Sequence, residues 1–251
     1  MSRSPYLVGR ITRTAPAGSR GISIDLDLRI RAQPGQFVMV WLPRVDEKPF
    51  SLVCDDPVSL TVVRVGPFTE RMQRLRPGEA LFLRGPLGNG FSLAGERPLL
   101  IGGGCGAAPL AFLAKRLREE GCSVTVALGA RTGADLLLAE RFAALGTRLI
   151  VSTDDGSLGE RGLVTDVAGR LLTEELYDHV YACGPAPMLD RVSELCRARG
   201  VPAQISQEAY MRCGTGICGS CDCGGGRLVC RDGPVFPVAP QHAMADTRPR
   251  G

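Results

Sequence analysis

Residues 99–109 read Leu-Leu-Ile-Gly-Gly-Gly-Cys-Gly-Ala-Ala-Pro, and this stretch decides the fold of the second half of the chain. The short apolar run predicts a buried strand, and the pattern from Pro109 to Glu120 predicts a helix directly after it. Gly102, Gly104 and Ala107 fit the spacing G-x-G-x-x-A, in which glycines let a pyrophosphate approach the backbone at a helix N-terminus. A tight turn without a ligand would explain the same residues, so the match needs the context of the surrounding chain.

The chain after this stretch repeats the alternation of strand and helix. Further apolar strands are predicted at Ser123–Leu128, Arg148–Ser152 and His179–Ala182, and helices at Leu163–Leu172 and Pro187–Arg199. This order predicts a doubly wound parallel sheet, whose ligands bind outside the carboxyl ends of the strands.

Two details bear on the nucleotide that such a sheet would bind. The turn Cys183-Gly184-Pro185 forms a second junction between strand and helix that faces the same crevice, with Cys183 interpreted as a small core residue. The acidic residue that usually holds the adenosine ribose should close the second strand, but that strand ends in Gly129-Ala130-Arg131. The choice between NAD and NADP therefore stays open.

The first part of the chain has a different sequence pattern. From Tyr6 to about Leu93, short runs alternate with period two between frequent turns such as Pro34-Gly35 and Pro77-Gly78, which predicts a small antiparallel barrel. We therefore divide the chain into a β-barrel domain at 1–96, an α/β nucleotide-binding domain at 97–205, and a segment at 206–251 that is rich in glycine and cysteine.

Four cysteines of the last segment have the spacing of iron ligands. Cys213, Cys218, Cys221 and Cys230 are separated by four, two and eight residues, which is the plant-type pattern for a [2Fe–2S] cluster. Gly214, Gly216 and Gly219 would let backbone amides reach the sulfurs. The alternative is a structural zinc site, which usually has two closely spaced pairs of ligands. Cys223 is expected not to bind iron.

Composition limits the class of protein. The net charge of +4 comes from intermingled basic and acidic residues, so nucleic acid is an unsuitable partner. Residues 1–10 lack the apolar stretch of a signal peptide, and no run is long enough to span a membrane, so a cytoplasmic location is expected. Ten cysteines in a reducing compartment favour metal binding over disulfides.

Several motifs carry a resemblance to a known family. Lys48-Pro49-Phe50-Ser51, the run GPLGNGF at 85–91, and Cys230-Arg-Asp-Gly-Pro-Val-Phe236 join the motifs above. From Tyr6 to Pro237 the chain resembles the ferredoxin-reductase superfamily and, within it, the electron-transfer subunits of bacterial NAD-dependent dihydroorotate dehydrogenase.

The resemblance implies three redox groups, namely FAD, NAD(H) and the [2Fe–2S] cluster. Lys48 would replace the family arginine at the FAD diphosphate, and Ser51 would approach the isoalloxazine ring. The full set implied for FAD and NAD is Lys48, Pro49, Phe50, Ser51, Val62, Val63, Arg64, Phe68, Thr69, Gly102, Gly104, Cys183 and Gly184. Among these, Phe68 and Thr69 would reach the phosphates, while Gly102, Gly104, Cys183 and Gly184 belong to the nicotinamide nucleotide.

The resemblance also implies a function in pyrimidine biosynthesis. The partner would be an FMN-containing dihydroorotate dehydrogenase catalytic subunit, in a heterotetramer with two copies of each chain. Because a hydride carries two electrons and the cluster takes one, a flavin must stand between NAD and the cluster. No residue of the chain is expected to perform acid–base chemistry on carbon. The alternatives are the small flavin subunit of an NADPH–ferredoxin oxidoreductase and a non-redox binding module stabilised by zinc.

Overall fold

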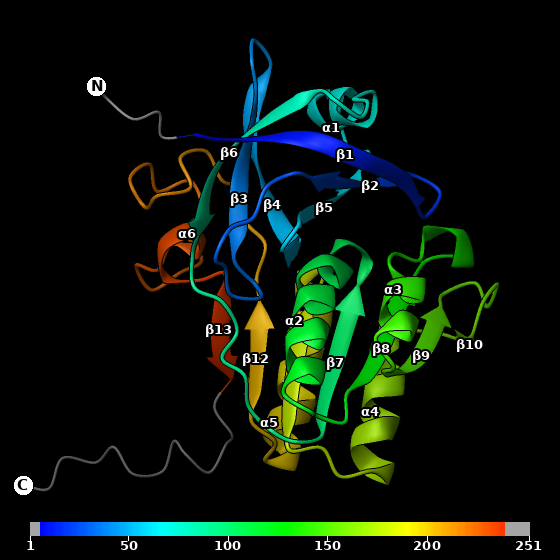
Figure 1. Cartoon of the computed structure of the whole chain (residues 1–251). Coiled ribbons are helices and arrows are strands. Elements are labelled where there is room, and N and C mark those ends of the chain that lie inside the picture. The colour runs from blue at the N-terminus through cyan, green and yellow to red at the C-terminus, as the bar shows by residue number, and fades with distance from the viewer. Residues whose placement is uncertain (1–5, 239–251) are drawn as a thin grey trace, which may run out of the picture.

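A computed structural model describes residues 6–238 of the chain (Figure 1). The outer ends of the predicted segments 1–96 and 206–251, and half of the stretch considered for a signal peptide, lie outside the described residues. No helix within 6–238 is both long enough and apolar enough to cross a membrane.

The first part of the chain forms a closed antiparallel barrel with the strand order β1-β2-β5-β4-β3-β6, which confirms the prediction. Its interior is filled by apolar side chains that alternate with outward-facing ones, including Leu52, Leu60 and Leu81, all fully buried. The elements of the barrel are β1 (Leu7–Ala17), β2 (Gly21–Leu26), β3 (Phe37–Leu42), β4 (Asp46–Asp55), β5 (Val58–Val63), α1 (Pro67–Gln73) and β6 (Ala80–Leu87).

The short helix α1 was not predicted from the sequence. It starts at Pro67, a residue suited to the first helical position. The Thr69 hydroxyl accepts hydrogen bonds from the backbone amides of Val65 and Gly66 at 2.9 and 3.1 Å. This local cap starts a helix in a stretch that lacks the apolar periodicity of a longer one.

The second part of the chain forms a seven-stranded sheet with the order β10-β9-β8-β7-β11-β12-β13. All neighbouring strands are parallel except β12 and β13, so the predicted doubly wound parallel sheet is confirmed with one antiparallel edge strand added. The elements are β7 (Pro98–Gly103), η1 (Gly104–Gly106), α2 (Ala107–Glu119), β8 (Thr125–Ala130), η2 (Gly133–Asp135), α3 (Ala139–Ala144), β9 (Arg148–Thr153), β10 (Glu160–Arg161), α4 (Val164–Glu174), β11 (His179–Cys183), α5 (Ala186–Arg199), β12 (Ala203–Ser206), α6 (Val229–Asp232) and β13 (Val235–Val238).

Helices cover both faces of this sheet. On β7, Leu100 packs with α2, whereas Leu99 and Ile101 pack in the core that contains α4 and α5. This alternation follows from the pleat, which directs successive side chains to opposite faces. In Figure 1 the arrows of β7 and β12 are directed at the barrel. The carboxyl ends of the parallel strands therefore face the barrel, which is where ligands of such sheets bind.

The two junctions between strand and helix, after β7 and after β11, are in backbone contact. A Cβ atom on Gly106 would lie only 1.9 Å from the carbonyl oxygen of Cys183 and 2.3 Å from its carbonyl carbon. Gly106 itself has an ordinary φ of −61°, so its glycine is required by this close approach and not by backbone strain. The start of α2 is thereby held against the end of β11.

We expect Gly106→Ala to lower the free energy of unfolding by about 3 kcal/mol, because the added methyl group meets backbone atoms that cannot rotate away. Gly66→Ala is the matched control, since Gly66 has an extended φ of 176° and nothing lies within 4 Å of an added Cβ. The control should change stability by less than about 0.5 kcal/mol. Urea unfolding of both variants measures the difference, and equal effects would contradict the packing argument.

Candidate functional site

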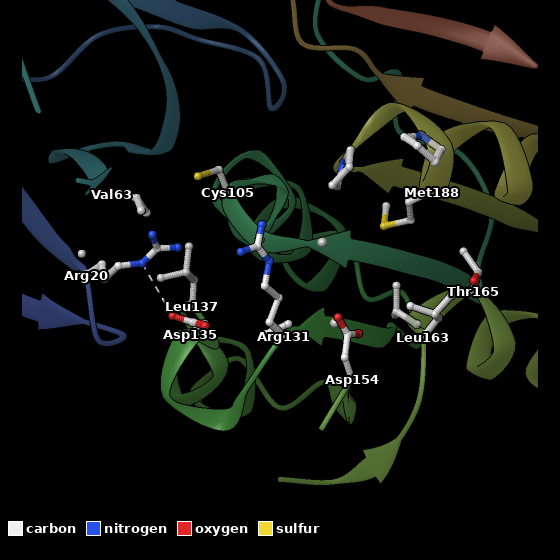
Figure 2. Close-up of a pocket in the computed structure, with 18 of the residues that line it drawn as sticks. Arg20, Val63, Cys105, Arg131, Asp135, Leu137, Asp154, Leu163, Thr165 and Met188 are labelled. Carbon is white, nitrogen blue, oxygen red and sulfur yellow. Dashed lines mark ion pairs between the residues drawn. The ribbon is translucent and has the colours of Figure 1, made fainter. Parts of the chain in front are cut away.

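A cavity of about 670 Å³ lies between the barrel and the carboxyl ends of the sheet strands (Figure 2). Its volume is in the range of small-molecule and cofactor sites. The barrel contributes Arg20, Val63 and Val65, and the sheet contributes residues that follow β7, β8, β9 and β11. The cavity thus joins both domains at the edge where a doubly wound sheet binds its ligands.

The first turn of α2 makes one wall of the cavity suitable for an anion. It contains no acidic residue, and no side chain caps its backbone amides. Gly104, directly before it, has a φ of +53° with open space where a Cβ would stand, and it lines the cavity. A pyrophosphate could therefore approach this backbone and benefit from the helix dipole.

Charged side chains of both signs also line the cavity. Arg20 forms an ion pair with Asp135 at 3.8 Å, drawn as the dashed line in Figure 2. The Ser19 hydroxyl donates a hydrogen bond to Asp135 at 2.8 Å, and this bond is the main cause of the lowered pKa of that carboxyl group. Arg131 and Asp154 line the same cavity. None of these five residues was proposed as a site residue from the sequence, although Arg131 was noted there as a departure from the usual pattern.

The residues predicted for the nicotinamide nucleotide divide into two groups. Gly104 lines the cavity, whereas Gly102 lies within β7 beside Leu128 and packs in the core. Cys183 is buried at the end of β11, where burial raises the pKa of its thiol, and Gly184 packs against Met188. The prolines and methionine that follow this junction, Pro185, Pro187 and Met188, do line the cavity. The assignment of the four residues to the nucleotide stays a prediction.

Of the residues implied for a flavin, Val63 lines the cavity. Val62 points into the barrel core, and Phe50 stacks on Phe68 with ring centroids 6.1 Å apart. The Thr69 hydroxyl is used in the cap of α1, where it also donates to the carbonyl of Gly66 at 2.9 Å. The remaining members, Pro49, Ser51 and Arg64, lie half-buried in β4 or exposed just after β5.

Lys48 has two contacts, and both lie away from the cavity. Its ammonium group pairs with Asp46 at 2.5 Å and lies 5.7 Å from the ring centroid of Tyr210. The side chain thus bridges β4 and the start of the cysteine-rich segment. Its predicted role at a diphosphate stays a prediction.

The four predicted iron ligands form two pairs of thiols. The sulfurs of Cys221 and Cys230 are 3.2 Å apart and buried, whereas Cys213 and Cys218 interact with each other closer to the surface. A rhombic two-iron cluster needs two thiolates on each iron, so this donor set fits the group. Within residues 6–238, no three or more His, Cys, Asp or Glu side chains are arranged to hold a single metal ion.

Backbone amides point at these sulfurs, as the glycine-rich loop predicts. The amide of Gly216 donates to the Cys230 sulfur at 3.1 Å, and the amide of Thr215 donates to the Cys213 sulfur at 3.4 Å. The second bond is the main cause of the lowered pKa of Cys213, about 5, so that its thiolate is favoured at neutral pH. Gly214, Gly216 and Gly219 all have positive φ values. The thiol of Cys223 instead donates to the carbonyl of Arg227 in its own turn at 3.3 Å.

An arginine of the barrel holds the loop that carries Cys213. Arg84 on β6 donates to the Cys213 carbonyl at 2.8 Å and to both carboxylate oxygens of Glu47 at 3.1 and 2.7 Å. The side chains of Arg84 and Glu47 are only 21% and 18% exposed, so the pair is poorly screened by water. Sequence reasoning missed this contact, because Arg84 and Cys213 are far apart in the chain.

Glu208 is a second residue near the cavity that was not predicted from the sequence. It follows β12 by two residues and is close enough to Cys105 and Cys183 to contribute to the raised pKa of both thiols. Burial is the larger cause of both raised pKa values, and burial also raises the pKa of the Glu208 carboxyl group. Only five positions separate it from Cys213.

Two family models match the chain over the regions just described. The model described as the iron–sulfur cluster binding domain of dihydroorotate dehydrogenase B matches residues 208–239. The model described as an oxidoreductase NAD-binding domain matches residues 100–194. The two matches lie on the cysteine-rich segment and on the doubly wound sheet.

Relatives of similar length carry one shared description. The probable dihydroorotate dehydrogenase B (NAD(+)) electron transfer subunit of Methanopyrus kandleri is 48% identical over 209 residues, which cover 82% of this chain and 80% of the relative. The protein of the same description from Thermococcus kodakarensis is 46% identical over 207 residues, covering 82% of this chain and 85% of the relative.

Solved structures share the fold. A chain of the NADH-dependent reduced ferredoxin-NADP oxidoreductase, described in work on flavin-based electron bifurcation, superposes with a TM-score of 0.82 at 30% identity, covering 94% of this chain and 90% of that chain. The ferredoxin reductase of carbazole 1,9a-dioxygenase has a TM-score of 0.68 at 24% identity, over 78% of this chain and 66% of that chain. The second comparison supports the fold alone.

We expect serine replacement of Cys213, Cys218, Cys221 or Cys230 to abolish or strongly alter the visible absorption of the cluster and to lower the iron content per chain. Cys223→Ser is the matched control and should leave both unchanged, because the Cys223 thiol is bonded within its own turn. Absorption spectra and iron analysis of the purified variants provide the measurement. Loss of the cluster in Cys223→Ser together with its retention in Cys230→Ser would show that the ligand assignment is wrong.

We expect Arg84→Met to destabilise the protein by about 2 kcal/mol, because it leaves the Glu47 carboxylate and the Cys213 carbonyl without their donor. Arg74→Met removes an exposed ion pair with Glu70, in which the side chains are 67% and 49% exposed. This control should cost about 0.5 kcal/mol or less. Thermal unfolding and iron retention of the two variants provide the measurement. Equal losses of stability and of iron in both variants would contradict the proposed role of Arg84.

Proposed function

Because this chain belongs to the family of dihydroorotate dehydrogenase B electron transfer subunits, we propose that it passes electrons between NAD(H) and a catalytic partner through bound FAD and a [2Fe–2S] cluster. The observation that carries the proposal is the position of the two thiol pairs relative to the cavity. Ser206 at the end of β12 is paired with Cys183 at the end of β11, and the chain reaches the first predicted iron ligand, Cys213, seven residues after Ser206. A nucleotide site and an iron site are thus built next to each other.

A flavin and a two-iron cluster supply the conversion of a two-electron hydride into single electrons. The residues of the chain bind and position these groups. The open backbone at Gly104 and the first turn of α2 support binding of a nucleotide pyrophosphate. Val63 and Arg20 place the barrel wall against the same cavity, which supports a flavin between the barrel and the nucleotide. Amides of Thr215 and Gly216 stabilise the thiolates of Cys213 and Cys230.

The residues implied for FAD and NAD, and the division into segments 1–96, 97–205 and 206–251, remain part of this proposal. The cavity supports Val63 and Gly104 most directly, since both line it. FAD is proposed over FMN because the family resemblance gives the flavin a diphosphate for Lys48 and Thr69 to hold. The ten cysteines, all within residues 6–238, form no disulfide with one another, and a cytoplasmic location stays part of the proposal.

The family description of an electron transfer subunit implies a catalytic partner. We propose that this partner is an FMN-containing dihydroorotate dehydrogenase chain, with two copies of each subunit in the complex. The surface next to the iron site supports a protein contact, because Tyr210 and Ile217 are 66% and 84% exposed there. Oxidation of dihydroorotate is assigned to the partner.

The small flavin subunit of an NADPH–ferredoxin oxidoreductase is the second candidate. It is favoured by the superposition on a chain of the NADH-dependent reduced ferredoxin-NADP oxidoreductase, at a TM-score of 0.82. The two candidates differ in the partner and in the substrate that the complex oxidises. The two relatives described above, both electron transfer subunits of dihydroorotate dehydrogenase B by description, favour the first candidate.

We expect the isolated chain, loaded with flavin and cluster, to oxidise NADH with an artificial electron acceptor but to leave dihydroorotate unchanged. Addition of the catalytic subunit encoded in the same organism should start NAD-dependent dihydroorotate oxidation, because the substrate pocket belongs to the partner. Steady-state assays with and without that subunit provide the measurement.

Hydrogen exchange gives a second readout of the same complex. Amides of residues 214–220 should be protected when the partner binds, because electrons must cross a short distance between the iron site and the partner. Dihydroorotate turnover by the chain alone would refute the relay, and an unprotected loop in an active complex would refute the assignment of the interface.

A further inference from the structure

An apolar stripe on the outside of the barrel continues beyond the edge of the cysteine-rich segment. The alternation of β3 directs Phe37, Met39 and Trp41 out of the barrel, because the residues between them belong to its interior core. Phe37 and Met39 are 3% and 0% exposed and pack in the core that contains Cys221 and Cys230. Trp41, the next outward residue along the strand, is only partly buried. The cysteine-rich segment therefore covers two positions of the stripe and leaves the third open.

Neighbouring strands widen the open end of this stripe. Phe82 on β6 is paired with Trp41 on one side and with Val8 of β1 on the other, so these three side chains form one row on the outer face. The Trp41 ring centroid lies 5.4 Å from that of Phe82 and 5.1 Å from that of Tyr6. Val8 is 55% exposed, and the three rings are partly exposed. We call Tyr6, Val8, Trp41 and Phe82 the apolar patch.

The composition of the apolar patch is unusual for the outside of an antiparallel barrel. Outward positions that face water are normally polar. The chain has one tryptophan and only 5% aromatic residues, yet the tryptophan and two further rings are gathered on this face. Aromatic side chains carry a large apolar area, and tryptophan and tyrosine often dominate the binding energy of protein interfaces. A second protein surface over the patch would remove this area from water.

The apolar patch adjoins the iron site through Arg84. Arg84 follows Phe82 by two residues on the same face of β6 and donates to the Cys213 carbonyl at 2.8 Å. In Figure 1 the orange loops of the cysteine-rich segment lie beside β3 and β6. A catalytic partner that exchanges electrons with the iron site must contact this side of the molecule. The loop at 214–220 is far smaller than the roughly 20 to 30 residues that a stable interface takes on each side. The contact must therefore extend onto the neighbouring surface.

We propose that the apolar patch is a docking surface for the catalytic partner subunit, which covers it with an apolar surface of its own when it contacts the iron site. Trp41 is the anchor of this contact, because its ring lies between those of Tyr6 and Phe82 at the centre of the patch. The inference rests on the proposed function, from which it takes the partner. It adds a contact area on the barrel to the contact expected at residues 214–220.

The first test observes Trp41 directly. Because Trp41 is the sole tryptophan of the chain, labelling with 5-fluorotryptophan gives one fluorine resonance. Addition of the unlabelled catalytic subunit of the same organism to the labelled holoprotein should shift this resonance. It should also remove the difference in its frequency between H₂O and D₂O, because the ring leaves water. An unshifted resonance in a complex that oxidises dihydroorotate with NAD would overturn the inference.

The second test measures the affinity of holoprotein variants for the catalytic subunit by isothermal titration calorimetry. Trp41→Ala should weaken binding about 30-fold or more, the loss expected for a tryptophan at the centre of an interface. Val8→Lys should weaken it about tenfold, because the contact would bury an unpaired charge. Leu176→Lys is the matched control and should bind as the wild type does. Leu176 is 83% exposed between α4 and β11, at the end of the sheet farther from the barrel.

Flavin content, iron content and NADH oxidation with an artificial acceptor should be those of the wild type in all three variants, since none of these residues lines the cavity. Wild-type affinity in both patch variants would overturn the inference. Sedimentation equilibrium of the holoprotein provides a further check. A wild-type dimer that becomes a monomer in Val8→Lys, with unchanged affinity for the catalytic subunit, would also overturn it, because a second copy of the chain would then cover the patch. A wild-type holoprotein that does not bind the catalytic subunit would instead refute the proposed function.

Discussion

The antiparallel pairing of β13 with β12 is the constraint on which the iron site depends. Four residue pairs, from Ala203 with Val238 to Ser206 with Val235, return the chain to the edge of the sheet. The intervening residues 207–234 carry all four predicted ligands and would be a free tail without this return. Fixing both ends of the segment removes part of the conformational entropy that the chain would otherwise lose when the thiols converge.

The closed segment is also held against the barrel, so that the two domains support it together. Arg84 donates to the carbonyl of Cys213, while the amide of Asn89 donates to the Gly233 carbonyl at 2.6 Å. Asn89 belongs to the GPLGNGF run that closes the barrel, and Gly233 belongs to the run after Cys230. Two motifs that are far apart in the sequence are therefore in contact, and the distance between the iron site and the barrel is set by these polar contacts.

The fold was largely predictable, because its elements are encoded by local patterns. Period-two alternation with frequent turns specified the barrel, and the alternation of apolar strands with helices specified the parallel sheet. The helix α1 and the strand β13 were missed for physical reasons. The helix depends on the Thr69 cap and not on an apolar stripe, and β13 is a four-residue edge strand that contains Pro237. Proline is common at such edges but weakens the pattern by which a strand is recognised.

The candidate site was predictable only in part. Cysteine spacing by itself predicted the iron ligands as a set, because a cluster requires four thiolates within reach of one loop. The glycine turn after β7 likewise predicted a nucleotide site, and Gly104 of this turn lines the cavity. The tertiary structure decided which residues face the cavity and which contact other parts of the fold. The Lys48 side chain contacts Asp46 and Tyr210 and lies away from the cavity. The close approach of Cys183 requires a glycine at position 106, and the amide of Asp154 donates to the Ala130 carbonyl. These outcomes depend on strand register and domain packing, which join residues distant in the chain, and a pattern read along the sequence contains only the order of those residues.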